Sequence, residues 1–125
     1  MVKEERHVVC IEDEPEMIDL VRVILEPKGF RVVGANGGVE GLQVVRSVRP
    51  DVVLLDLMMP DLDGWEVYQE MKADAELKAI PVIIITARAQ SIDKVLGLRI
   101  AKVDDYITKP FSPQDLLESV RNIIT

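Results

Sequence analysis

Short apolar runs alternate with longer amphipathic segments along the chain. Three of the runs contain only apolar residues, mostly Val, Ile and Leu, which predicts strands buried on both faces of a parallel sheet. These runs are Val8–Ile11, Val52–Leu55 and Val82–Ile85. Two more polar runs, Arg31–Ala35 and Tyr106–Lys109, predict the strands at the edges of that sheet.

The segments between these runs predict five helices. The last is the clearest, because apolar residues recur on one helical face and a good N-cap and a first-turn proline precede them. These residues are Leu116, Leu117, Val120, Ile123 and Ile124, with Ser112 and Pro113 before them. The others are Glu16–Glu26, Val39–Val48, Trp65–Ala73 and Ile92–Ile100. Strand and helix thus alternate five times, which predicts an α/β fold with a five-stranded parallel sheet flanked by five helices.

The composition is typical of one soluble domain. The chain has 125 residues, within the usual size of a single domain. Its formal net charge of −7, without any basic run, disfavours direct binding to nucleic acid or to an anionic membrane. The one cysteine, Cys10, excludes an internal disulfide framework, and no apolar run approaches the roughly 18 residues of a membrane span. We therefore expect a cytoplasmic protein, with no second domain after the last predicted helix of this chain.

Polar residues stand at the ends of four of the five predicted strands. Glu12 and Asp13 follow the first strand and Asp56 the third, while Thr86 and Lys109 end the fourth and the fifth. Ligands of open α/β sheets bind at the carboxyl ends of the strands. If the first and third strands are neighbours, three carboxylates meet in one small space. Their mutual repulsion favours either retained protons or a divalent cation, Mg²⁺ (or Mn²⁺).

These residue types suit phosphoryl transfer. A cation would shield Asp56 and admit a phosphoryl group, which the carboxylate could attack to give an acyl phosphate. Lys109 would place positive charge near the phosphoryl oxygens, and Thr86 would donate a hydroxyl hydrogen bond. Each residue alone fits an ordinary role as a helix cap, a turn residue or a surface charge, but their shared position favours a site. No Walker loop or Gly-x-Gly-x-x-Gly motif competes with this interpretation.

Four segments of the sequence resemble the receiver domain of bacterial two-component signalling, of the chemotaxis type. They are Val8–Pro15, Val52–Gly64, Ile83–Ala87 and Asp105–Phe111. Their order and spacing together are specific, and the match covers essentially the whole chain, from Val8 to Ile124. The resemblance implies a doubly wound, flavodoxin-like sheet with strand order 2-1-3-4-5, and one stand-alone receiver domain over residues 1–125.

The resemblance also implies roles for the acidic residues. Asp56 matches the phosphoacceptor, and Asp13 matches the direct ligand of Mg²⁺. Glu12 stands where aspartate is commoner and would act on the metal mostly through water. The backbone carbonyl of Met58 matches the third protein ligand of the metal.

Three further residues match the parts of a receiver that sense the phosphoryl group. Thr86 matches the switch hydroxyl, Tyr106 the switch aromatic residue and Lys109 the phosphate-binding lysine. The Lys109–Pro110 bond matches a cis peptide of the family. The implied output surface is formed by residues 92–100, 103–109 and 112–124, which would bind a downstream protein or a second copy of the chain.

The resulting functional hypothesis is a signalling phosphoacceptor. It would take a phosphoryl group from a histidine kinase or phosphotransfer protein, and would catalyse only its own phosphorylation and dephosphorylation. An aspartyl-nucleophile phosphatase is disfavoured, because such enzymes need a second aspartate where Met58 stands. Two alternatives remain: the receiver part of a longer regulator with a separate output domain, and an interaction module that works without phosphorylation.

Overall fold

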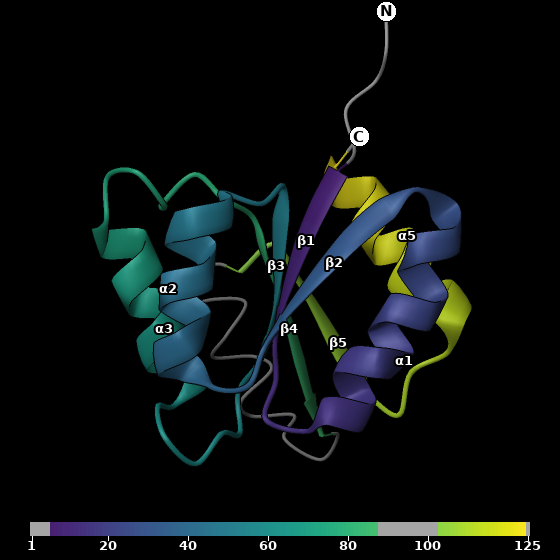
Figure 1. The fold of residues 1–125 in the computed structure, drawn as a ribbon, viewed down its shortest axis with the longest axis horizontal. Helices are drawn as coiled ribbons and strands as arrows, with labels where there is room; N and C mark the ends of the chain where they lie inside the picture. Colours follow the sequence, from purple (N-terminus) through teal and green to yellow (C-terminus); the bar gives the residue numbers. More distant parts are fainter. Residues whose placement is uncertain (1–5, 88–102, 125) are drawn as a thin grey trace, which may run out of the picture.

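The computed structural model describes residues 6–87 and 103–124, which form one parallel sheet with helices on both faces (Figure 1). The strands are β1 (Arg6–Ile11), β2 (Phe30–Ala35), β3 (Val52–Asp56), β4 (Val82–Ala87) and β5 (Asp105–Lys109). They lie in the order β2-β1-β3-β4-β5, and all neighbours are parallel. The predicted sheet and its strand order are confirmed, with β2 and β5 at the edges.

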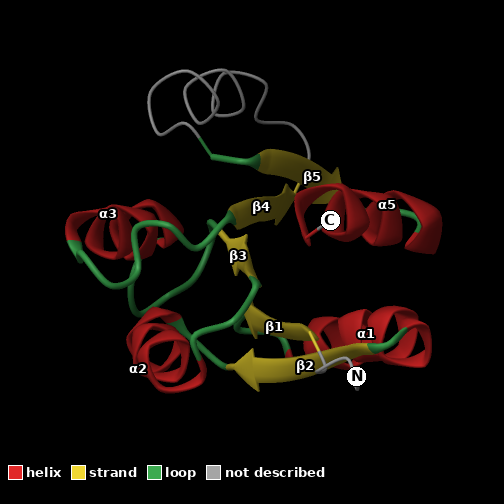
Figure 2. Ribbon diagram, turned by 90° about the horizontal axis from the view of Figure 1, so that it is seen from above, coloured by secondary structure: helices red, strands yellow, loops and turns green. Residues whose placement is uncertain are grey.

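Four described helices cover the two faces of the sheet. They are α1 (Pro15–Leu25), α2 (Gly38–Val48), α3 (Gly64–Ala73) and α5 (Pro113–Ile124), with a short 3-10 turn, Glu26–Lys28, after α1. Figure 2 shows α1 and α5 on one face and α2 and α3 on the other. The predicted helix Ile92–Ile100 lies outside the described residues. No helix within residues 6–87 and 103–124 is long and apolar enough to cross a membrane.

An apolar layer fills each side of the sheet. Under α2 and α3, the helices contribute Leu42, Val45, Val67, Tyr68 and Met71. Under α1 and α5, they contribute Ile18, Val21, Leu25, Leu116, Leu117 and Val120. All five residues of β3 are buried, because this strand lies in the middle of the sheet with a layer on each face. Burial on both faces explains why the central strands are apolar without alternation.

Strand pairing, rather than hydrophobicity alone, sets where the strands end. β1 begins earlier than predicted because its pairing with β2 continues to Arg6 and Phe30. β4 extends beyond its apolar run because Ala87 still lies opposite Lys109 of β5. α5 begins as predicted, since the Ser112 hydroxyl accepts a 3.0 Å hydrogen bond from the backbone N–H of Asp115.

The parallel arrangement brings the carboxyl ends of all five strands to the same end of the sheet, which is the lower end in Figure 1. The β1–α1 and β3–α3 loops lie at this carboxyl end of the sheet. Because β1 and β3 are hydrogen-bonded neighbours, with Ile11 opposite Leu55, the residues that follow these two strands are brought together.

Candidate functional site

Three carboxylates meet at the carboxyl ends of β1 and β3. One oxygen each from Glu12, Asp13 and Asp56 lies within 4.8 Å of the other two. Glu12 comes directly after β1 and is 2% exposed, and Asp56 is the last residue of β3 and is 4% exposed. Asp13 is half-buried. Two almost fully buried carboxylates so close together are unfavourable unless protons, cations or hydrogen-bond donors compensate them.

Backbone hydrogen bonds hold the two buried carboxylates in place. The N–H of Glu12 donates to the carbonyl of Ala35 in β2, at 3.0 Å, which extends the sheet by one residue beyond β1. The Glu12 carboxylate accepts from the N–H of Glu14 at 3.3 Å. The Asp56 carboxylate accepts from the N–H of Met58 at 3.1 Å. Both side chains are therefore oriented by the first residues of the loops that follow their strands.

Lys109 brings a positive charge to the cluster from the end of β5. Its Nζ lies 3.0 Å from a Glu12 oxygen, 3.7 Å from an Asp56 oxygen and 3.8 Å from an oxygen of Glu14. The lysine side chain is 17% exposed. Burial by itself would lower the pKa of Lys109, but the hydrogen bond that Lys109 donates to Glu12 and the charges of Asp56, Glu12 and Glu14 outweigh it and raise the pKa. The lysine therefore stays protonated and serves as a fixed cation.

Glu12 binds protons more tightly than an ordinary glutamate. Burial raises its pKa to about 7; the hydrogen bond with Lys109 opposes the rise, and the nearby Asp56 charge adds to it. One lysine thus does not fully neutralise the cluster near neutral pH. A divalent cation bound here would favour the ionised form of Glu12.

The donor set fits Mg²⁺. All three side chains offer carboxylate oxygens, the hard ligands that Mg²⁺ prefers, and their spacing allows one ion to reach all three. Asp13 is partly exposed, which leaves room for the water ligands that Mg²⁺ usually keeps. Met58 follows Asp56 by two residues, and its side chain is 66% exposed, so the β3–α3 loop is open to solvent beside Asp56.

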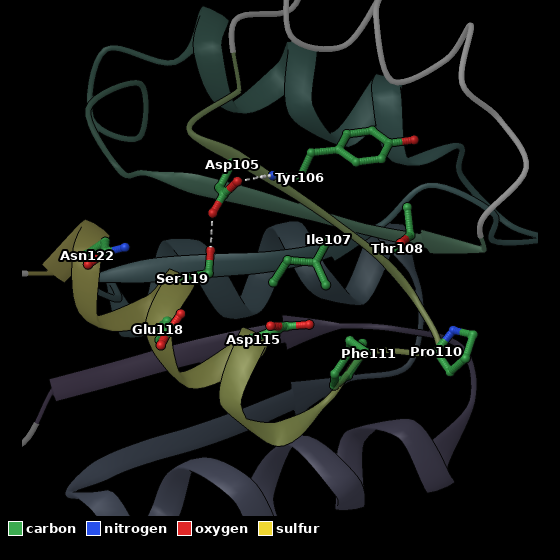
Figure 3. Close-up of a pocket in the computed structure, with 10 residues that line it drawn as sticks. All are labelled: Asp105, Tyr106, Ile107, Thr108, Pro110, Phe111, Asp115, Glu118, Ser119 and Asn122. Atoms are coloured by element: carbon green, nitrogen blue, oxygen red, sulfur yellow. Dashed lines mark hydrogen bonds between the residues drawn. The ribbon is translucent and has the colours of Figure 1, made fainter.

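The two residues expected to act as switches lie on neighbouring strands. Thr86 belongs to β4, where it pairs with Thr108 of β5; its side chain is outside the described part of the structure. Tyr106 of β5 is 8% exposed and packs in the layer under α2 and α3. Figure 3 shows its ring on the opposite side of β5 from Asp115 and Ser119 of α5. The Lys109–Pro110 peptide is cis, as the resemblance implies.

The structure also places Gly64 in the site, a residue without an assigned role in the sequence analysis. Its N–H donates to the carbonyl of Leu57 at 3.1 Å. A Cβ atom at this position would lie 2.4 Å from the backbone oxygen of Asp56 and 2.6 Å from the Cα of Leu57. Only glycine therefore allows α3 to begin against the end of β3. The Asp63–Gly64 pair before an amphipathic segment is the local signal that could have indicated this contact.

A sequence model described as the response regulator receiver domain matches residues 8–121. The chain belongs to this family. Its receiver domain is 40% identical, over 121 residues, to the transcriptional regulatory protein CseB of Streptomyces avermitilis, covering 97% of this chain and 50% of that protein. It is 35% identical over 116 residues to the DNA-binding response regulator MtrA of Mycolicibacterium smegmatis, covering 93% of this chain and 49% of that protein. The chain thus spans about half the length of these curated relatives.

Solved structures support the same fold. The CheY-like receiver domain protein of Methanospirillum hungatei superposes with a TM-score of 0.87 at 27% identity, covering 97% of this chain and 94% of that one. The chemotaxis protein CheY4 of Vibrio cholerae has a TM-score of 0.88 at 24% identity, covering 96% of this chain and 99% of that one, and shows the fold alone. The predicted identity as a two-component receiver domain, a signalling phosphoacceptor, is confirmed. Receiver domains bind Mg²⁺ in an acidic pocket, and this chain has such an acidic cluster.

Proposed function

We propose that Asp56 is the residue of this receiver that accepts the phosphoryl group. The observation that carries the proposal is the position of Asp56, almost fully buried at the end of β3, in the acidic cluster and 3.7 Å from the ammonium group of Lys109. An Asp56 oxygen would attack phosphorus, forming an acyl phosphate while the bond from phosphorus to the donor breaks. The donor would be a phosphohistidine of a histidine kinase or phosphotransfer protein, and its imidazole would leave with the electron pair and take up a proton.

Glu12, Asp13 and Asp56, with the backbone carbonyl of Met58, are the proposed protein ligands of Mg²⁺ (or Mn²⁺). The first three lie close enough to bind one ion. When bound, the ion would neutralise charge on the cluster and on the incoming phosphoryl group. Lys109 would form charge-assisted hydrogen bonds to a phosphoryl oxygen in exchange for its present contact with Glu12. Thr86 would donate its hydroxyl to another phosphoryl oxygen.

The same geometry argues against an aspartyl-nucleophile phosphatase. Such an enzyme needs a proton donor two residues after the nucleophile, and Met58 has no acidic proton to give. We propose instead that the receiver catalyses only its own phosphoryl transfer and that water slowly hydrolyses the acyl phosphate. The coexistence of Asp56, its acidic neighbours and Lys109 in one site also argues against an interaction module that has lost phosphorylation.

Phosphorylation is expected to require a divalent metal. Incubation of the protein with acetyl phosphate and Mg²⁺ should add the mass of one phosphoryl group, measured on the intact protein. The same incubation with excess EDTA should leave the mass unchanged, because the uncompensated carboxylates would repel the phosphate dianion. Restoring Mg²⁺ to the chelated sample is the control for damage to the protein. Equal labelling with and without metal would contradict the proposed metal site.

Mg²⁺ binding is expected to strengthen as the pH rises from 6 to 8. Ligands must be deprotonated to bind a metal, and the pKa of Glu12 is raised to about 7. Calorimetric titration should therefore give a dissociation constant roughly tenfold lower at pH 8 than at pH 6. In the metal-free protein, the stability of the fold has the opposite pH dependence. Between pH 4.5 and about 7 the folded state binds more protons than the unfolded one, so stability falls as the pH rises.

Glu12→Gln is the control for this pH dependence. The amide does not titrate, so the variant should bind Mg²⁺ with nearly the same affinity at both pH values. A variant that keeps the full pH dependence of the wild type would show that another group is responsible.

The proposed output surface includes the edge strand β5 and the helix α5. A groove of about 320 Å³ lies between them (Figure 3). Asp105 is one of the residues that line it, and its carboxylate accepts hydrogen bonds from the N–H of Tyr106, at 2.7 Å, and from the hydroxyl of Ser119. A downstream protein or a second copy of the chain would bind over residues 103–109 and 112–124. Residues 92–100, the third part of the predicted surface, lie outside the described residues.

We propose that residues 1–125 act as one receiver domain in the cytoplasm. The family match over residues 8–121 and the continuous sheet support a single folding unit. CseB and MtrA are about twice as long as the part that matches this chain. The receiver part of a longer regulator therefore remains the second candidate for the biological unit. The full reading frame of the gene distinguishes the two.

A further inference from the structure

The amino terminus of α2 is capped by a residue from a distant loop. Its N-cap residue, Gly37, has no side chain and provides no capping hydrogen bond. Instead, the Asp61 carboxylate accepts from the N–H of Gly38 at 3.1 Å through one oxygen, and from the N–H of Val39 at 3.2 Å through the other. These are the first two residues of α2, where N–H groups have no partner within the helix.

Two adjacent glycines make room for this carboxylate. A Cβ atom on Gly37 would lie 2.9 and 3.0 Å from the two carboxylate oxygens of Asp61. A Cβ atom on Gly38 would lie 2.6 Å from the Cβ of Leu62 and 3.0 Å from its carbonyl oxygen. The start of α2 is thus shaped to fit against residues 61 and 62. The two N–H groups also lower the pKa of Asp61, so the carboxylate is charged at neutral pH.

Asp61 lies in the same loop as the proposed metal ligand Met58. The first half of this β3–α3 loop is anchored to the site by the hydrogen bond from the N–H of Met58 to the Asp56 carboxylate. At its end, the Asp63 carboxylate accepts from the N–H of Trp65 at 2.7 Å, a local contact between residues two positions apart. Among the hydrogen bonds of described residues, those of Asp61 are the ones that join the middle of the loop to a different helix. Met59 and Leu62, which precede and follow Asp61 in the sequence, pack against the apolar layer under α2 and α3.

We propose that Asp61 is a positioning residue of the phosphorylation site. By holding the β3–α3 loop against α2, its carboxylate keeps the backbone of Met58 in the place that metal binding requires. This inference rests on the proposed Mg²⁺ site at Asp56. Groups that orient a ligand without touching the metal commonly affect affinity, because a mobile ligand loses entropy on binding.

The test compares Mg²⁺ affinity among variants of the full chain. Trp65 is the sole tryptophan and stands at the start of α3, so its fluorescence can report metal binding at this loop. Asp61→Ala is expected to raise the dissociation constant of Mg²⁺ roughly tenfold. Gly37→Ala should also raise it, because the added Cβ displaces the carboxylate that is still present. In a double variant the effects should not add, since both changes remove one contact.

Asp74→Ala is the matched control. Asp74 follows the other end of α3; its carboxylate accepts from the N–H of Glu76 at 2.8 Å and pairs with Arg46. Its loss should lower the melting temperature to a similar extent while leaving Mg²⁺ affinity at the wild-type value. If Asp61 had a purely structural role, Asp61→Ala would likewise lower the melting temperature without changing the Mg²⁺ affinity.

Wild-type Mg²⁺ affinity in folded Asp61→Ala would overturn the inference, as would equal weakening in Asp74→Ala. If Asp61→Ala does not fold, as judged by circular dichroism, Gly37→Ala decides the question in the same way. A wild-type protein that shows no response to Mg²⁺ would instead contradict the proposed metal site itself. Failure of this inference is thus distinguishable from failure of the proposed function.

Discussion

Replacement of Asp56 by Asn is expected to abolish phosphorylation by acetyl phosphate. The amide is a poor nucleophile toward phosphorus, and the variant also loses one of the three carboxylates that could hold Mg²⁺. The fold should survive, because the amide oxygen can still accept the hydrogen bond from the N–H of Met58. Removing one buried negative charge from a self-repelling cluster should leave the metal-free protein at least as stable as the wild type.

Intact-protein mass spectrometry after incubation with acetyl phosphate and Mg²⁺ measures this effect directly. Asp51→Asn is the matched control, since Asp51 is exposed and its carboxylate accepts from the N–H of His7 in β1, away from the acidic cluster. This control should be labelled like the wild type. Labelling of Asp56→Asn at the wild-type level would show that another residue is the phosphoacceptor.

Replacement of Lys109 by Ala is expected to impair activation much more than folding. Its ammonium group lies 3.0 Å from Glu12 and 3.7 Å from Asp56, and hydrogen bonds to charged groups contribute roughly 1.5–3 kcal/mol. In the unphosphorylated protein the cluster can respond to the loss by retaining protons, since the pKa of Glu12 is already about 7. A phosphoryl group on Asp56 cannot compensate for the missing lysine by retaining protons in this way at neutral pH. The Lys109→Ala change should therefore destabilise the activated state more than the resting state.

NMR spectra recorded on adding beryllofluoride, a mimic of the phosphoryl group, should reveal this difference. In the wild type we expect shifts to extend from Asp56 to Tyr106 and α5. In Lys109→Ala the shifts should stay near Asp56, because the link from the site to the end of β5 is lost. Lys78→Ala, which removes an exposed lysine outside the acidic cluster, should behave like the wild type. Undiminished shifts at Tyr106 and α5 in Lys109→Ala would contradict this role.

Much of the fold could be predicted from local pattern. The central strands are apolar throughout because both of their faces are buried. Such an unbroken apolar run can be recognised in the sequence without knowing which strands pair with it. The N-cap Ser112 is another local signal, since its hydroxyl binds an N–H only three residues away. The ends of β1 and β4 were less predictable, because pairing with the next strand extends them into polar residues.

The candidate site was predictable only in part. The sequence indicated acidic residues at the ends of β1 and β3, and the structure brings Glu12, Asp13 and Asp56 within 4.8 Å of one another. The order of the strands in space, which makes this possible, came from the resemblance to receiver domains rather than from periodicity. The strength of the Lys109 contact with Glu12 was not apparent from the chain, because 97 residues separate the two.

The sequence by itself determined the alternation of strands and helices, the apolar character of the central strands and the polar residues that end them. These features depend on neighbours one to four residues apart, so the periodicity of the chain records them. Tertiary structure alone decided that Lys109 contacts Glu12, how the pKa of Glu12 is raised, and that Asp61 caps a helix that begins 23 residues before it. Such contacts depend on strand order and on the close approach of backbones at Gly37 and Gly64, and local sequence patterns carry no record of either.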